Sequence, residues 1–94
     1  MKIITRTIEL KILVDDNDNH SFESHSRELS KAIGYLASWA IMGDGMPAVK
    51  LALDVEGDLS ASYLDKDGNQ KYSIFGLRDD ESADKKYSFH SQEI

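Results

Sequence analysis

Two absences limit what this protein can be: the chain has no cysteine and no long apolar run. Disulfides and thiolate metal sites are therefore excluded, and a cysteine-free chain is typical of the reducing cytoplasm, which is the location we expect. No segment reaches the roughly 18 to 20 apolar residues of a membrane-spanning helix. Residues 1–14 lack the apolar core and the small-residue cleavage site of a signal peptide, so we expect no such peptide.

Clustered positive charge is a third absence. The chain has 11 lysines and arginines against 17 aspartates and glutamates, a net charge of −6, and its basic residues are scattered. Because contacts to phosphates need clustered lysine and arginine, we expect no direct binding to nucleic acid. The acidic charge leaves two interpretations open, ordinary solubility or mimicry of nucleic acid. If mimicry exists, the best candidate is the acidic surface made by Asp79, Asp80, Glu81 and Asp84.

Recognisable catalytic motifs are missing as well. The chain has no H-E-x-x-H, no G-x-S-x-G elbow, no G-x-G-x-x-G loop and no phosphate-binding loop. The only histidines are His20, His25 and His90, and the spacing of the first two puts them on no common helix face. We therefore expect the histidines to be surface or capping residues, and we predict no catalytic residue, no cofactor and no enzymatic activity.

The segment Asp65–Asn69, with the sequence DKDGN, resembles the middle of a calcium-binding loop. With Gly68 at the sixth position of such a loop, the first and twelfth positions fall on Tyr63 and Ile74, where aspartate and glutamate are required. Half of the ligands are missing, so the segment is better explained as a hairpin turn, and no metal site is predicted. The oxygen-rich run Asp15–Asn19 is likewise interpreted as a solvated turn.

Length and periodicity predict one small domain. Ninety-four residues are too few for two independent cores. Helical periodicity covers about residues 27–42, and alternating periodicity covers about residues 4–14, 48–55, 59–63 and 70–77. The prediction is an α+β two-layer sandwich, with one amphipathic helix packed on a mostly antiparallel sheet, in the order β(β)αβββ(β). The bracketed strands are a short one near His20–Ser24 and a last one through Tyr87 and Phe89.

The domain prediction follows from this order. Residues 1–78 form the α+β domain, and residues 79–94 form an acidic loop followed by an edge strand or a frayed tail. Asp67-Gly68 predicts a two-residue hairpin turn, and Gly57 predicts another tight turn. Gly76 predicts a bulge or a change of facing within its strand. The predicted core combines the inward positions of the strands and one helix stripe: Ile8, Leu10, Ile12, Leu29, Ile33, Leu36, Val49, Leu51, Leu53, Tyr63 and Ile74.

The helix carries more apolar surface than one side of a small domain can cover. Tyr35, Trp39 and Met42 lie beside the core stripe at i, i+4, i+7 spacing, and small residues (Ser30, Gly34 and Ser38) recur every fourth position. We predict a protein interface made by Tyr35, Trp39, Met42, Ser38 and Gly34. The alternative is that the C-terminal segment, through Tyr87 and Phe89, folds over this flank and closes the core.

These observations favour a non-enzymatic, acidic protein-binding module. Its partner is expected to be a larger protein that it occupies or inhibits, or a second copy of itself in a homodimer. The small size and the acidity have the general look of accessory proteins of phages and other mobile elements, although no motif carries that impression. The alternative function is a small enzyme or ligand-binding protein that uses His20, His25 and nearby carboxylates.

Overall fold

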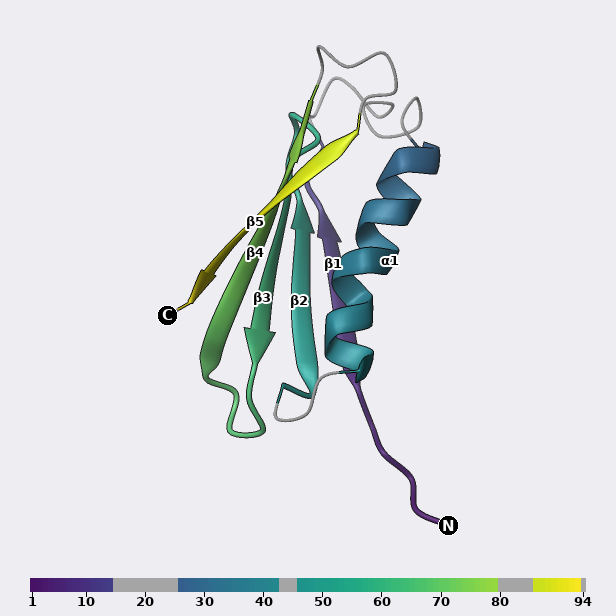
Figure 1. Cartoon of the computed structure of the whole chain (residues 1–94), viewed down its shortest axis with the longest axis vertical. Helices are drawn as coiled ribbons and strands as arrows, with labels where there is room; N and C mark the ends of the chain where they lie inside the picture. Colours follow the sequence, from purple (N-terminus) through teal and green to yellow (C-terminus); the bar gives the residue numbers. More distant parts are fainter. Residues whose placement is uncertain (15–25, 43–45, 80–85, 94) are drawn as a thin grey trace.

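The computed structural model describes residues 1–14, 26–42, 46–79 and 86–93. Within these residues the helix α1 packs against one face of a five-stranded sheet, whose strand order follows the chain (Figure 1). The predicted α+β two-layer sandwich is confirmed. The bounds of the elements are β1 (Thr7–Ile12), α1 (Ser26–Met42), β2 (Ala48–Leu53), β3 (Leu59–Leu64), β4 (Gln70–Arg78) and β5 (Tyr87–Glu93).

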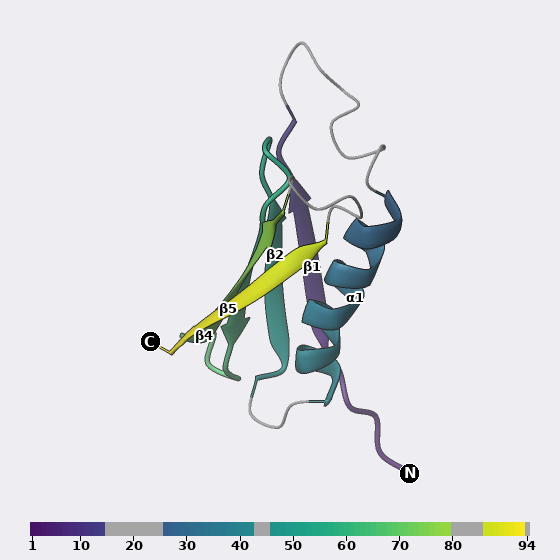
Figure 2. The same cartoon turned by 45° about the horizontal axis from the view of Figure 1, so that its top comes forward.

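The sheet is antiparallel except at its first edge. β1 pairs with β2 in parallel, and the other three pairs, β2 with β3, β3 with β4 and β4 with β5, are antiparallel. Parallel neighbours need a long crossover, and α1 supplies it here. β5 confirms the predicted last strand as an ordered edge strand, and Figure 2 shows it running obliquely across the sheet, with its start near α1.

The core lies between α1 and the helix-facing side of the sheet. The helix contributes residues at positions 29, 32, 36 and 40, a spacing that puts them on one stripe. The fully buried Tyr63 of β3 ties the two layers together, because its Oη donates a hydrogen bond to the Leu36 carbonyl at 2.7 Å. The buried apolar residues are Leu29, Ala32, Leu36, Ala40, Val49, Leu51, Leu53, Leu59, Ala61, Tyr63 and Ile74.

The predicted core is wrong at four positions. Ile8, Leu10 and Ile12 are 45%, 40% and 42% exposed, although they share the helix-facing side with the buried residues of β2. The reason is that β1 is an edge strand with a described neighbour on one side only. Ile33 packs against the core but is only partly buried.

Both hairpin turns have the same construction. In the first, the Asp54 carbonyl accepts from Gly57 N–H, and Asp54 N–H donates to the Asp58 carbonyl. Asp65–Asn69 repeats this pattern with Gly68. Gly57 and Gly68 have φ of +90° and +85°, the left-handed region that favours glycine. The second turn therefore has three residues between its flanking positions, Asp65 and Asn69, and the predicted two-residue turn is wrong.

Gly76 has a different role from the predicted one. The register shift between β3 and β4 lies at Tyr63/Leu64, and Gly76 pairs regularly with Leu59 and Phe89. A Cβ at Gly76 would lie 3.2 Å from the Phe89 ring. The missing side chain thus gives the aromatic ring room to pack over the strand.

Several predictions fall on residues outside the described part of the chain. These are the turn at Asp15–Asn19 and the short strand near His20–Ser24. Among the described residues, α1 is too short and too polar to cross a lipid bilayer.

Candidate protein-binding surface

An aromatic cluster lies on the flank of α1 that faces β5. Tyr35 and Trp39 are one helical turn apart, and their rings meet edge to face with centroids 6.2 Å apart and planes at 79°. Phe89 of β5 approaches Tyr35 from the sheet, with ring centroids 4.5 Å apart. The cluster therefore joins the helix to the far edge of the sheet.

Phe89 can contact Tyr35 because the residue opposite Phe89 in the sheet is a glycine, Gly76. Phe89 stands opposite Gly76 in the β4–β5 ladder, where no side chain competes for the space above the sheet. Its ring fills that space and its outer part meets Tyr35. The C-terminal strand thus covers one side of Tyr35, as the alternative for this flank expected.

β5 covers only part of the apolar side chains on this flank of α1. Tyr35 and Trp39 remain 44% and 42% exposed, and Met42, one turn further along the helix, is 82% exposed. Phe89 itself is 36% exposed. An exposed group of large apolar side chains therefore remains on this flank, and its role as an interface stays a prediction.

The two small residues of the predicted interface differ in their local structure. Gly34 is exposed, and a Cβ built on it would meet nothing within 4 Å, so another backbone has open space to approach the helix there. The Ser38 hydroxyl donates a 2.6 Å hydrogen bond to the Tyr35 carbonyl. That bond satisfies the hydroxyl within the helix and leaves it little tendency to seek a partner outside.

A shallow groove of about 260 Å³ adjoins the aromatic cluster. Its rim carries an ion pair in which Lys31 Nζ lies 3.2 Å from Glu28 Oε1, and the pair is solvated. Tyr87, on the β5 side, donates its hydroxyl hydrogen to the Gly57 carbonyl at 2.7 Å. The groove is mainly apolar, and its lining residues are Glu28, Lys31, Ala32, Tyr35, Lys86, Tyr87 and Phe89.

The predicted acidic surface is only partly within the described residues. Asp79 is exposed, and its N–H donates to the Lys86 carbonyl at 2.8 Å. Asp80, Glu81 and Asp84 lie outside the described residues. On β1 the charges are mixed, since Lys11 Nζ lies 3.4 Å from Glu9 Oε1. Mimicry of nucleic acid stays a prediction.

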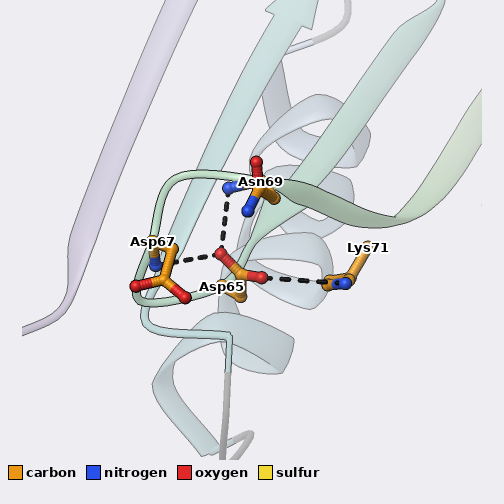
Figure 3. A network of polar contacts seen from close by, with 4 residues as sticks. All are labelled: Asp65, Asp67, Asn69 and Lys71. Atoms are coloured by element: carbon orange, nitrogen blue, oxygen red, sulfur yellow. Dashed lines mark hydrogen bonds and ion pairs between the residues drawn. The ribbon is translucent and has the colours of Figure 1, made fainter.

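The Asp65 carboxylate serves the second hairpin turn (Figure 3). Its Oδ1 accepts hydrogen bonds from the N–H groups of Asp67 and Asn69, both at 2.9 Å, and its Oδ2 lies 3.8 Å from Lys71 Nζ. The Asn69 hydrogen bond contributes most to lowering the pKa of Asp65, and the Asp67 N–H and the Lys71 ammonium act in the same direction. The carboxylate thus stabilises the turn through protein donors.

Among the described residues, His90 is the one histidine. His90 is exposed on β5, with Nε2 3.4 Å from Ser88 Oγ, while His20 and His25 lie outside the described part of the chain. Where side chains are described, no group of three or more histidines, aspartates and glutamates is placed to hold a metal ion.

Comparisons with protein-family models, with curated proteins and with solved structures found no match to this chain. The chain is therefore characterised by its own fold and surfaces. Sequence reasoning singled out the aromatic flank of α1, which is made by Tyr35, Trp39 and Met42, and its role as an interface stays a prediction. It did not single out the exposed apolar row of β1, which is made by Ile8, Leu10 and Ile12.

Proposed function

We propose that this protein is a non-enzymatic binding module that attaches to a larger protein through the aromatic flank of α1. The observation that carries the proposal is the exposed cluster of Tyr35, Trp39 and Met42. Tyr35 and Trp39 leave 44% and 42% of their surface in water, and Met42 leaves 82%. Neighbouring exposed apolar side chains of this size are typical of protein interaction sites.

The geometry of the cluster suits a binding site. The edge-to-face contact of Tyr35 with Trp39, and the support of Phe89 beneath Tyr35, restrict the rings before any partner arrives. Restricted aromatic side chains lose little conformational entropy on binding, and tyrosine and tryptophan are enriched among the residues that dominate binding energy. A small acidic module of this kind would act by occupying or modulating its partner, as accessory proteins of phages and mobile elements do.

The test is a comparison of three chains in affinity capture from a lysate of the source cells. The variant Tyr35→Ser with Trp39→Ser removes the aromatic flank. The control Phe75→Ser with Leu77→Ser removes side chains of similar exposure, 39% and 44%, from the outward face of β4. Circular dichroism and thermal unfolding establish that all three chains are folded.

The expected result is a protein retained by the wild type and by the control variant, and lost from the Tyr35/Trp39 variant. A partner retained equally by all three chains would show that the aromatic flank is not the binding surface. Unfolding of the Tyr35/Trp39 variant alone would show that the two rings belong to the core, and the proposal would then be abandoned.

A further inference from the structure

The outer edge of β1 presents backbone groups that pair with no strand among the described residues. Thr7 N–H donates to the Pro47 carbonyl at 2.9 Å and Leu13 N–H to the Leu53 carbonyl at 2.8 Å, so the odd-numbered residues of β1 direct their backbone groups toward β2. By alternation, the N–H and C=O groups of residues 8, 10 and 12 point away from the sheet. Among the described strands, none pairs with this side of β1.

The same three residues carry the exposed apolar row. Ile8, Leu10 and Ile12 stand on the helix-facing side of the sheet and are 40% to 45% exposed. Natural edge strands are usually protected against pairing by proline, by bulges, by inward-pointing charges or by charged side chains such as lysine. Within Thr7–Ile12, β1 has no proline, no bulge and no charge on its helix-facing side, and its only charged side chains are Glu9 and Lys11, which have opposite signs.

We propose that β1 pairs antiparallel with β1 of a second copy of this chain, with Leu10 of each copy opposite Leu10 of the other. Pairing through the outward backbone groups joins even-numbered residues to even-numbered residues. Ile8 then lies opposite Ile12 of the second copy, and the two apolar rows become one continuous row. The two sheets merge into a single sheet with a two-fold axis at Leu10.

Charge selects this register over its neighbours. On the opposite face of β1, Glu9 and Lys11 form an ion pair within the strand, with Lys11 Nζ 3.4 Å from Glu9 Oε1. With Leu10 on the axis, Glu9 of each copy faces Lys11 of the other, so four charges alternate in sign. A shift in one direction places Glu9 opposite Glu9, and a shift in the other places Lys11 opposite Lys11, which is unfavourable.

The helices fit the same arrangement. A two-fold axis perpendicular to the sheet places both copies of α1 on one face, and the flank of α1 opposite Tyr35 is turned toward the axis. That flank carries Ala37 and the 56% exposed Ile41. Small residues at such a contact allow two helices to approach closely. The surface is separate from the aromatic flank, so this inference goes beyond the proposed function.

Charge reversal tests the proposal directly. Glu9→Lys alone places lysine opposite lysine twice in each dimer, and Lys11→Glu alone places glutamate opposite glutamate twice. Each single variant should raise the dimer Kd roughly tenfold or more. The double variant Glu9→Lys with Lys11→Glu restores opposite charges and should recover the dimer. An equal mixture of the two single variants should form a heterodimer, because the two lysines on β1 of one chain then face the two glutamates on β1 of the other.

The measurement is sedimentation velocity over a wide range of concentration, with amide hydrogen exchange as a second readout. As the dimer forms, the amides of residues 8, 10 and 12 should become protected from exchange. The amides of Thr7 and Leu13 should not change, because they already donate hydrogen bonds to the carbonyls of Pro47 and Leu53. The variant Tyr35→Ser with Trp39→Ser should dimerise like the wild type, which separates this proposal from the proposed function.

Two results would overturn the inference. A wild-type chain that is monomeric up to about 500 µM has no such dimer. A dimer that ignores both charge reversals, or in which the amides of residues 8, 10 and 12 exchange freely, forms through another surface.

Discussion

Replacing Tyr63 with phenylalanine should lower stability at neutral pH and raise it at strongly alkaline pH. Tyr63 is fully buried, and its Oη donates to the Leu36 carbonyl at 2.7 Å. Phenylalanine keeps the ring and loses only this hydrogen bond. The Leu36 carbonyl retains its helical partner, the Ala40 N–H, so no buried acceptor is orphaned. We expect the free energy of unfolding at pH 7 to fall by about 0.5–1.5 kcal/mol.

The alkaline effect has the opposite sign. Burial raises the pKa of Tyr63 well above its usual value, and the phenols of Tyr35 and Tyr72 add to the increase. In the unfolded chain the phenol ionises at about pH 10. Above about pH 10 the unfolded state therefore binds fewer protons than the folded state, and the wild type loses up to about 1.4 kcal/mol of stability per pH unit through this group.

The two stability curves should therefore cross. The contribution of the phenol is complete below its unfolded pKa and is lost as the pH rises toward its folded pKa. If the hydrogen bond contributes about 1 kcal/mol, the wild type and Tyr63→Phe become equally stable at about pH 10.7. Above that pH the variant is the more stable protein.

The assay is urea unfolding followed by circular dichroism, at several values between about pH 7 and pH 11.5. The difference between the two chains isolates Tyr63, because every other titrating group is present in both. A difference that stays constant over this range would show that the phenol titrates normally and is open to solvent. A loss above about 3 kcal/mol at pH 7 would show that the hydroxyl holds the layers together more strongly than one neutral hydrogen bond does.

Four further measurements test other parts of the fold. Leu36→Ala should cost about 2–5 kcal/mol in urea unfolding because Leu36 is fully buried, and a cost below about 1 kcal/mol would mean that the helix faces the sheet differently. Gly34→Ala should add about 0.5–1 kcal/mol, since the new methyl group meets open space in an exposed helix interior, and a loss would contradict that environment. Gly76→Ala should cost about 1–3 kcal/mol because its Cβ would press on Phe89, and an unchanged unfolding midpoint would contradict the packing. Millimolar calcium should leave the thermal midpoint unchanged relative to a chelator, because the Asp65 carboxylate already accepts protein hydrogen bonds, and a clear rise would reveal a site.

The helix and the strands with a clear hydrophobic periodicity could be predicted from the sequence, whereas the packing around each of them could not. The helix predicted over 27–42 runs from Ser26 to Met42, and the meander from Ala48 onward has the predicted order. Alternation in β1 correctly placed Ile8, Leu10 and Ile12 on the helix-facing side. It said nothing about how much of the face of β1 the helix would cover, and this coverage determines whether the face is buried.

The second hairpin turn, Asp65–Asn69, and Gly76 also depend on contacts that hydrophobic periodicity does not predict. Asp67-Gly68 correctly predicted a hairpin, but the sequence did not reveal that Asp65 would accept two backbone N–H groups and close a three-residue loop. Gly76 was recognised as unusual, and its reason lies 13 residues further along the chain in the Phe89 ring. Such contacts depend on how distant segments pair in the folded sheet, and hydrophobic periodicity carries no information about that pairing.

The proportions of the two layers explain why apolar surface remains on both flanks of the helix. An α-helix with its side chains is roughly 10–12 Å wide, whereas strands lie about 4.8 Å apart, so a single helix covers little more than two strands. The twist of this sheet brings the start of β5 back toward α1, where Phe89 meets Tyr35 (Figure 2). That contact leaves Trp39 and Met42 exposed on one flank. On the other flank, Ile8, Leu10 and Ile12 of β1 remain 40% to 45% exposed at the edge of the sheet. Within the described residues, the one helix of this βαββββ fold thus leaves apolar surface on both of its flanks, and pairing of β1 with a second copy would cover the one that β5 does not reach.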